Sequence, residues 1–372
     1  MKRAISLLLC VLILYTGVVR ARASEDGPQI AAKAHALIDA RSGRVLSSNE
    51  GGVRLPMAST TKIMTALLVL ENATLTDVVQ IGKVASGVEG SSMYLEVGER
   101  QTVENLLLGL MLRSGNDAAV ALAVHVSGSV EEFVALMNER ARQMGLKDTQ
   151  FRNPHGLPAE GHYTTALELC AIMAQALTHD EFVRIIGTRR AQVPWDGHPW
   201  DRVMTNKNRL LEELEGCIGG KTGYIDASGR CLVMAAERDG MRLVGVVLNC
   251  PDWWNQMAAL MEWGFARFDA HVFLELGEST HTLNTGGKPS RVDAVAAEML
   301  ALPVSQGEEL ALRIEILAMP KPPYAAGQPL GVALAVVDGE ELASVRLVAA
   351  QDVVGNRFGD AVGRILALWV GG

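Results

Sequence analysis

The residues of this sequence that could do chemistry begin with a serine and a lysine three positions apart, Ser59 and Lys62. On a helix this spacing puts the hydroxyl and the amine on one face, one turn apart. A neutral lysine can then take the serine proton, provided that burial and a neighbouring cation lower the amine pKa from its ordinary value of about 10.4. The pair alone is weak, because chance produces this spacing on the order of once in a chain of this length. An N-cap serine and a surface lysine would explain it equally well.

Two further motifs offer groups that could complete such a site. Ser114 and Asn116 follow a leucine-rich stretch and supply a hydroxyl that can relay a proton and an amide that can bind a substrate carbonyl. Lys221, Thr222 and Gly223 supply a cation, a hydroxyl and a backbone position open to close pairing with a substrate chain. Taken separately, the first motif is explained by a polar turn and the second by the end of a strand.

The surrounding pattern predicts that the first two motifs lie on or beside helices. Apolar residues at helical spacing over Ile63–Leu70 indicate a buried helix that begins close to the first motif. Thr102 can cap a second helix that runs to Met111 and ends before the second motif. Capping boxes at Ser129 and Thr165 predict two more helices, so the middle of the chain is mostly helical.

Strands are predicted on either side of this helical region. Residues 34–48 indicate a β-hairpin, and the apolar runs 231–236 and 243–248 flank an Asp-Gly step that favours a tight turn. A helix is expected over 253–268. Strands at both ends with helices between them predict an α+β domain over residues 24–270, in which the terminal strands share one antiparallel sheet.

The C-terminal part of the sequence has a different pattern. Helical periodicity fades over residues 271–355, and alternating segments such as 310–317 and 331–337 predict a small β-rich domain. Residues 356–372 place apolar side chains on one helical face. This tail is predicted either to lie on a membrane surface or to dock on its own domain.

The first 23 residues are typical of a secretory signal peptide, with two basic residues, an apolar run and a small-x-small cleavage site. The alternative, an uncleaved anchor, has too short an apolar run. This segment holds four basic and no acidic residues, so its removal takes the net charge from −8 to −12, which disfavours nucleic-acid binding.

Export to an oxidising compartment would permit disulfides to form between the remaining cysteines. A Cys217–Cys231 disulfide is one possibility, and buried free thiols are the favoured alternative. The cysteine spacing does not suggest a zinc site.

Together the motifs have the order and contexts of the serine penicillin-recognising enzymes. The chain resembles the low-molecular-mass D-alanyl-D-alanine carboxypeptidases, penicillin-binding proteins of peptidase family S11, across essentially its whole mature length. The stretches that carry the resemblance are residues 58–66 (Ala-Ser-Thr-Thr-Lys-Ile-Met-Thr-Ala), 112–119 (Leu-Arg-Ser-Gly-Asn-Asp-Ala-Ala), 153–157 (Asn-Pro-His-Gly-Leu) and 220–224 (Gly-Lys-Thr-Gly-Tyr).

The resemblance implies a transpeptidase domain of the penicillin-binding and β-lactamase type, with a small C-terminal β-sandwich domain. It also implies removal of the terminal D-alanine from peptidoglycan stem pentapeptides, in the cell envelope. Ser59 would attack the carbonyl of the penultimate D-alanine and Lys62 would take its proton, while Ser114 and Asn116 would shuttle the proton and hold the peptide. β-Lactam antibiotics would inhibit the enzyme covalently, and neither a metal nor a cofactor is implied.

The third motif would bind the other end of the substrate. Lys221 and Thr222 would hold the terminal carboxylate, and the backbone N–H groups of Ser59 and Tyr224 would form the oxyanion hole beside Gly223. Some relatives carry an arginine after the last long strand, where this chain has Pro-Asp-Trp-Trp-Asn. Lys207 is then either a cation that replaces this arginine at the substrate carboxylate or an ordinary loop residue.

Three rival functions can be weighed from the sequence. A β-lactamase needs an acidic residue poised on the deacylating water, and this chain has no Glu-x-x-Leu-Asn segment. A D,D-endopeptidase that cuts crosslinks uses the same residues and stays open. A non-enzymatic envelope-binding protein gives no reason for all three polar motifs to be intact.

Overall fold

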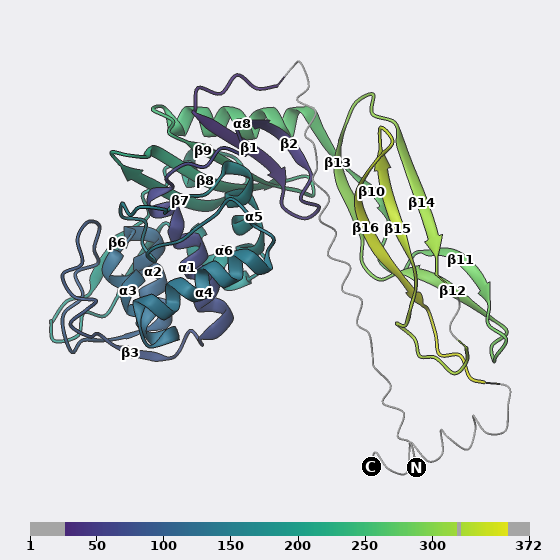
Figure 1. The fold of residues 1–372 in the computed structure, drawn as a ribbon, viewed down its shortest axis with the longest axis horizontal. Coiled ribbons are helices and arrows are strands. Elements are labelled where there is room, and N and C mark those ends of the chain that lie inside the picture. Colours follow the sequence, from purple (N-terminus) through teal and green to yellow (C-terminus); the bar gives the residue numbers. More distant parts are fainter. Residues whose placement is uncertain (1–26, 318–320, 356–372) are drawn as a thin grey trace, which may run out of the picture.

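The computed structural model describes residues 27–317 and 321–355. The predicted signal peptide, residues 1–23, and the predicted amphipathic tail, residues 356–372, lie outside these described residues. Figure 1 shows an N-terminal domain of helices and strands and an elongated, all-β C-terminal domain beside it.

The N-terminal domain is built on one antiparallel sheet of five strands in the order β2-β1-β9-β8-β7. Its strands are β1 (Ala34–Asp39), β2 (Val45–Asn49), β7 (Cys217–Ile225), β8 (Gly229–Arg238) and β9 (Met241–Leu248). Ala34 in β1 pairs with Leu248 in β9, which confirms that strands from the two ends of the domain share a sheet. Asp239 and Gly240 both have positive φ values between β8 and β9, as expected of a tight Asp-Gly hairpin turn.

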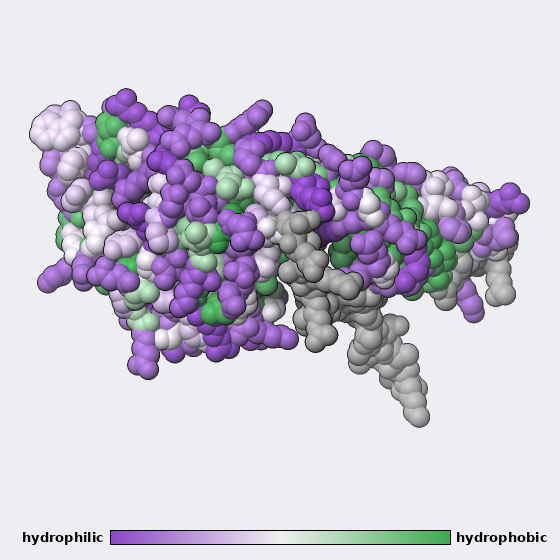
Figure 2. Space-filling view, turned by 90° about the horizontal axis from the view of Figure 1, so that it is seen from above, coloured by the Kyte–Doolittle hydropathy of each residue, from purple (hydrophilic) through white to green (hydrophobic). Residues whose placement is uncertain are grey.

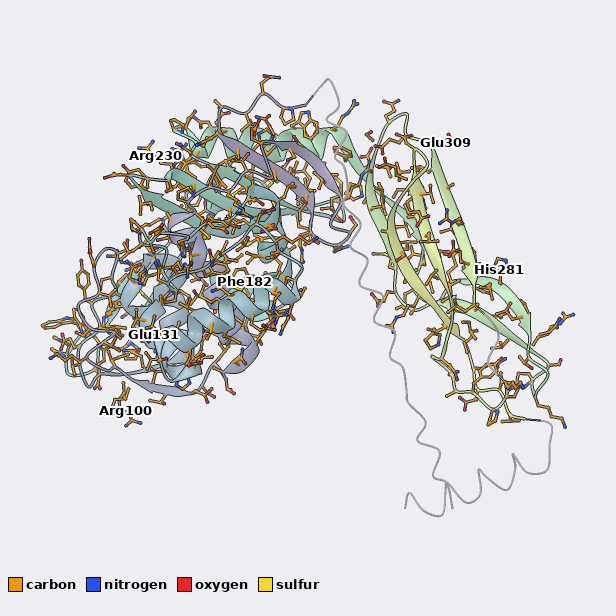
Figure 3. All side chains as sticks on the ribbon, in the orientation of Figure 1. Arg100, Glu131, Phe182, Arg230, His281 and Glu309 are labelled. Atoms are coloured by element: carbon orange, nitrogen blue, oxygen red, sulfur yellow. The ribbon has the colours of Figure 1, made fainter. Side chains whose placement is uncertain are left out.

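Helices cover both faces of this sheet (Figure 1). One face carries η1 (Ala58–Thr61), α1 (Lys62–Asn72), α2 (Val103–Leu108), the π-helical turn η2 (Gly109–Arg113), α3 (Asn116–Ser127), α4 (Val130–Gln143), α5 (Ala166–Ala176) and α6 (Asp180–Gly187). The other face carries α8 (Trp253–Arg267), and the short α7 (Leu210–Glu213) leads into β7. The larger apolar core lies on the helical face and includes Phe182 of α6, which is fully buried (labelled in Figure 3).

The predicted helix caps are present. The side-chain oxygens of Thr102, Ser129 and Thr165 each accept the backbone N–H three residues further on, at the starts of α2, α4 and α5. The Glu168 carboxylate accepts the N–H groups of Lys147 and Asp148, so it also ties down the loop that precedes the site residues 153–157.

Two small hairpins extend the helical layer. They are formed by β3 (Val78–Gln80) with β4 (Arg100–Thr102), and by β5 (Arg190–Val193) with β6 (Arg202–Thr205). Arg202 joins them through an ion pair with Glu99 in which both side chains are buried. Removing one partner of such a pair leaves an uncompensated charge, so the two hairpins are firmly connected.

The C-terminal domain has its own apolar core. Its strands are β10 (Phe268–Leu274), β11 (Ser279–Asn284), β12 (Arg291–Ala296), β13 (Leu300–Ser305), β14 (Leu310–Ile316), β15 (Pro329–Val337) and β16 (Glu340–Ala349). β10 pairs with β13, and the other five form a second sheet, which confirms the predicted β-rich fold. The expected helix over 253–268 ends at Arg267, because Phe268 already begins β10. In Figure 2 apolar patches interrupt a mostly polar surface on both domains.

The state of the cysteines is decided by strand register. Cys217 pairs with Ala236, whereas Cys231 pairs with Gly223, so the two cysteines lie roughly 20 Å apart along the β7–β8 ladder. No disulfide can span that distance, and Cys170, Cys217, Cys231 and Cys250 are free thiols.

Among the described residues no single helix is both long and apolar enough to cross a membrane. The bent pair α3 and α4 has the required length and composition, but α3 is packed into the core of the domain.

Candidate active site

Ser59 and Lys62 meet at the point where η1 becomes α1. Ala58 has a φ of 47°, a strained left-handed conformation that turns the chain sharply just before Ser59. The Lys62 side chain is completely buried, and its Nζ lies 3.0 Å from Ser59 Oγ. The structure therefore brings the two groups together as the helical spacing predicts.

Two carbonyl oxygens fix the Lys62 amine. Its Nζ donates to Asn116 Oδ1 at 2.7 Å and to the backbone oxygen of His155 at 2.6 Å. Burial holds the pKa of Lys62 well below its usual value, and the nearby Lys221 cation lowers it further. A neutral amine that gives its two hydrogens to these carbonyls directs its lone pair toward Ser59 Oγ. This geometry suits a general base.

The second motif lies beside this amine. Ser114 ends η2 in the left-handed conformation, and its Oγ is buried without a hydrogen-bond partner among the described residues. Asn116 begins α3, and its Nδ2 donates to the backbone oxygen of Glu89 at 2.6 Å while its Oδ1 accepts from Lys62. The Asn116 amide thus holds the lysine, and the Ser114 hydroxyl is left free to take part in proton transfer.

The third motif lies on β7, which runs along η1 at the free edge of the sheet. Gly223 has no room for a side chain, since a Cβ there would come within 3.0 Å of the backbone nitrogen of Ser59. Lys221 is buried and donates to the Thr222 carbonyl at 2.7 Å. Its pKa is lowered to about 7, first by burial and then by the charge of Lys207. The edge of β7 therefore places Lys221 near Lys62 and Gly223 next to the nucleophile.

Lys207 and Tyr224 flank this strand differently. Lys207 precedes β7 in the chain, and burial followed by the charge of Arg113 lowers its pKa. Its charge acts on both Lys62 and Lys221, so it belongs to the same electrostatic site. Tyr224 directs its ring to solvent, where its hydroxyl donates to Asp226 at 3.0 Å, so only its backbone faces the site.

A buried carboxylate next to the second motif was missed by sequence reasoning. Asp117 accepts hydrogen bonds from the backbone N–H groups of Met93 and Leu95 at 3.1 and 3.0 Å, and from Ser92 Oγ at 2.5 Å. It thereby fixes the loop whose Glu89 carbonyl holds Asn116. The only sequence signal is its place directly after the motif.

His162 is a second residue whose part in the site does not follow from the sequence. Its Nδ1 accepts the Arg152 N–H at 2.9 Å, so the proton of the neutral ring is on Nε2, which donates to Thr61 Oγ1 at 2.8 Å. The Thr61 hydroxyl in turn donates to the Ala58 carbonyl at 2.8 Å. Burial lowers the pKa of His162 to about 4, which keeps the ring neutral. This chain of bonds fixes the turn that presents the nucleophile.

The loop over residues 153–157 packs against the same turn. A Cβ at Gly156 would lie 1.9 Å from the Ala58 carbonyl oxygen, so only glycine allows this approach. The contact positions the His155 carbonyl on Lys62. Among the described residues, no group of three or more His, Cys, Asp or Glu side chains is arranged to hold a metal ion.

Comparison with known proteins agrees with this arrangement. Residues 20–252 match the family model of D-alanyl-D-alanine carboxypeptidases, and residues 268–355 match the C-terminal domain of penicillin-binding protein 5. The chain is 32% identical to the D-alanyl-D-alanine carboxypeptidase DacF of Bacillus subtilis over 99% of both proteins. It is also 32% identical to DacA of Haemophilus influenzae over 88% of this chain and 86% of that one.

A solved structure gives the same result. Penicillin-binding protein 5 from Haemophilus influenzae superposes with a TM-score of 0.76 and 31% identity, over 89% of this chain and 100% of that one. Both the sequence and the fold are therefore shared along nearly the whole length, and the chain belongs to the S11 family of serine-type D-alanyl-D-alanine carboxypeptidases.

Proposed function

We propose that this protein removes the terminal D-alanine from peptidoglycan stem pentapeptides through an acyl-enzyme on Ser59. The observation that supports this most directly is the buried Lys62 amine, held by two carbonyl oxygens with Ser59 Oγ at 3.0 Å. Such an amine can be neutral at physiological pH and can therefore activate a hydroxyl that is otherwise a weak nucleophile.

In the first step the Ser59 proton passes to Lys62 as Oγ bonds to the carbonyl carbon of the penultimate D-alanine. The negative charge that develops on the carbonyl oxygen is stabilised by the N–H groups of Ser59 and Tyr224. The close approach of Gly223 to the Ser59 nitrogen supports this pairing of donors.

Collapse of the tetrahedral intermediate breaks the bond to the terminal D-alanine. The leaving nitrogen must gain the proton that Lys62 holds, and the Ser114 hydroxyl, which has no other partner among the described residues, can relay it. Lys221, Thr222 and Lys207 bind the terminal carboxylate during this step. Water then attacks the ester, Lys62 accepts its proton, and Ser59 is regenerated.

β-Lactams enter the same reaction. Attack of Ser59 on the lactam carbonyl opens the ring, but the leaving nitrogen stays attached to the acyl group. It continues to occupy the space that the hydrolytic water needs. Inhibition is therefore covalent and long-lived.

The test uses Ser59→Ala, with the wild type labelled by a fluorescent penicillin. The variant should lose both the label and the release of D-alanine from a pentapeptide. Release at the wild-type rate by the variant would contradict the mechanism. Product analysis on intact and crosslinked muropeptides separates carboxypeptidase from D,D-endopeptidase activity.

The location of the enzyme is a further part of the proposal. Residues 1–23 direct export, and residues 356–372 contact the membrane surface from outside. Sequencing of the mature N-terminus should find Ser24 first. A chain truncated at Arg357 should partition less into the membrane fraction than the full-length chain, and equal partitioning would contradict the role of the tail.

A further inference from the structure

Two basic side chains next to the active site have no acidic partner among the residues that the structure describes. Arg113 is the last residue of η2 and is half-buried, and Lys207 is exposed on the turn after β6. Neither side chain forms a hydrogen bond or an ion pair with another described residue. Other arginines of the surrounding elements are each paired with a glutamate, namely Arg189 with Glu212, Arg202 with Glu99 and Arg209 with Glu213. The charges of Arg113 and Lys207 are therefore available to a ligand.

Arg113 and Lys207 lie on the side of the site where the leaving residue is released. Arg113 directly precedes Ser114, whose hydroxyl can relay the proton to the leaving nitrogen. η2 packs beside β6, which brings Arg113 close to Lys207. The charge of Arg113 lowers the pKa of Lys207, and the charge of Lys207 in turn lowers the pKa of Lys221. The three cations therefore follow one another from the carboxylate-binding edge of β7 to the end of η2.

The turn that carries Lys207 is held in place by the asparagines on either side of it. Asn206 Nδ2 donates to the backbone oxygens of Ile186 and Thr188, at 3.1 Å each. Asn206 Oδ1 accepts the Asn208 N–H at 2.9 Å. η2 is anchored by its buried apolar side chains, so the backbone positions of both cations are fixed before a ligand binds.

The substrate of the proposed reaction does not balance this charge. A terminal D-alanine carries one carboxylate, which Lys221 and Thr222 bind together with Lys207. Arg113 is then left without an anion, although its guanidinium presents five N–H donors in a planar fork that fits a carboxylate through two hydrogen bonds. Because Arg113 is half-buried beside other cations, an approaching anion stabilises it. A leaving residue with a second carboxylate has the group that is needed.

We infer that Arg113 forms, with Lys207, a subsite for a second carboxylate on the leaving residue. The enzyme then favours a dicarboxylic leaving residue over a neutral residue of the same shape. D-Glutamate allows the closest comparison, because D-glutamine is its neutral isostere. The inference rests on the proposed carboxypeptidase function and makes Arg113 a specificity-determining residue of that reaction.

The test compares three acetylated peptides L-Lys-D-Ala-X in which the leaving residue X is D-alanine, D-glutamate or D-glutamine. The wild type should have a kcat/KM for the D-glutamate peptide about fivefold above that for the D-glutamine peptide, the scale of a partly exposed ion pair. This ratio should fall as the salt concentration rises, because salt screens exposed charges. Titration with penicillin normalises each rate to the amount of active enzyme.

Two substitutions at Arg113 separate its charge from its structural contribution. Arg113→Gln should bring the ratio of kcat/KM between the D-glutamate and D-glutamine peptides to about one, whereas Arg113→Lys should keep a preference for D-glutamate, because it keeps the charge. Arg100→Gln is the matched control, since Arg100 is an exposed arginine of β4 at the end of the domain away from β7 (Figure 3). It should keep the wild-type ratio.

The outcomes distinguish the subsite from the activity itself. Equal kcat/KM for the D-glutamate and D-glutamine peptides in the wild type, or a ratio in Arg113→Gln as high as in the wild type, would overturn the subsite. The carboxypeptidase function would then stand on the release of D-alanine from the first peptide. Release of the leaving residue from none of the three peptides would overturn both.

Discussion

The Nζ atom of Lys62 lies 3.0 Å from Oγ of Ser59 and donates to two carbonyl oxygens that come from distant parts of the chain. Asn116 is 54 residues away in sequence and His155 is 93 residues away. The position of the base is therefore set by tertiary structure, although the pair itself is local. Both carbonyl oxygens accept hydrogen bonds and carry no net charge. They therefore orient the amine without forming an ion pair with it.

Replacement of Lys62 by arginine should abolish the general base. A guanidinium keeps its charge at any working pH and cannot take the Ser59 proton, so the rate of acylation should fall by about 10²–10⁴. The measurement is the rate of penicillin acylation, followed with D-alanine release. Lys147→Arg, at an exposed lysine, is the control and should leave both rates unchanged. Acylation by Lys62→Arg within a few-fold of wild type would assign the base elsewhere.

The pH dependence of peptide hydrolysis should reflect Lys221. Its pKa is about 7, and only the protonated form can pair with the substrate carboxylate, so kcat/KM should fall as the pH rises through neutrality. Lys221→Arg should shift this fall to higher pH, because the guanidinium stays charged. A substrate with an amidated C-terminus is the control and should lack the Lys221-dependent fall. An identical alkaline fall in wild type and Lys221→Arg would contradict this assignment.

The site residues that sequence can identify are those whose signal is local. Ser59 and Lys62 lie on one turn, and Lys221, Thr222 and Gly223 are adjacent in sequence. The contact of Lys62 with the His155 carbonyl cannot be identified in this way, because it is a backbone group that any residue could supply. Asn116 can be identified as a site residue, but its bond to Lys62 appears only in the structure. Asp117 acts through a loop without periodicity, so its role as a hydrogen-bond acceptor appears only in three dimensions.

The same distinction between local signals and tertiary contacts decides which parts of the fold can be predicted. The β8–β9 hairpin and the helix caps are predictable because a turn or a cap depends on a few adjacent residues. The pairing of β1 with β9 is also expected, since strands flank the helical region. The short strands β3 to β6 are not predicted, because three or four residues are too few to show alternation, and the buried Glu99–Arg202 contact that joins their two hairpins links distant parts of the sequence.

His162 should make the protein sensitive to acid. Burial lowers its pKa to about 4 in the folded chain from an ordinary value of 6.5, so the unfolded chain binds the proton more readily between these values. Stability should be full above about pH 6.5 and should fall as the pH drops toward 4, by on the order of 3 kcal/mol. His162→Gln, whose amide can still donate to Thr61, should reduce this dependence in urea unfolding.

The control for this experiment is His281→Gln, at an exposed histidine of the C-terminal domain (Figure 3). It should unfold with the wild-type dependence on pH. Burial also lowers the pKa of His155, to about 3, so a part of the acid sensitivity should remain in His162→Gln. Identical pH dependence in wild type and His162→Gln would show that His162 does not carry the linkage.

Arg44 should control how firmly the two domains are joined. Its guanidinium, on the turn between β1 and β2, pairs with Glu308 of the C-terminal domain, and the two side chains are only 11% and 15% exposed. It also donates to the Pro303 carbonyl and lies over the Phe268 ring. Arg44→Ala should weaken this contact by about 1–3 kcal/mol, because the Glu308 carboxylate loses its cation.

The expected result is faster limited proteolysis at the junction of α8 and β10 and a larger radius of gyration, with D-alanine release from a soluble peptide retained. Retention is expected because the residues around Ser59 all come from the N-terminal domain. Arg41→Ala is the matched control, since Arg41 lies on the same turn but pairs with Glu237 inside its own domain. If Arg44→Ala were as compact and as protease-resistant as Arg41→Ala, the apolar contacts around Phe268 would hold the domains together without this ion pair.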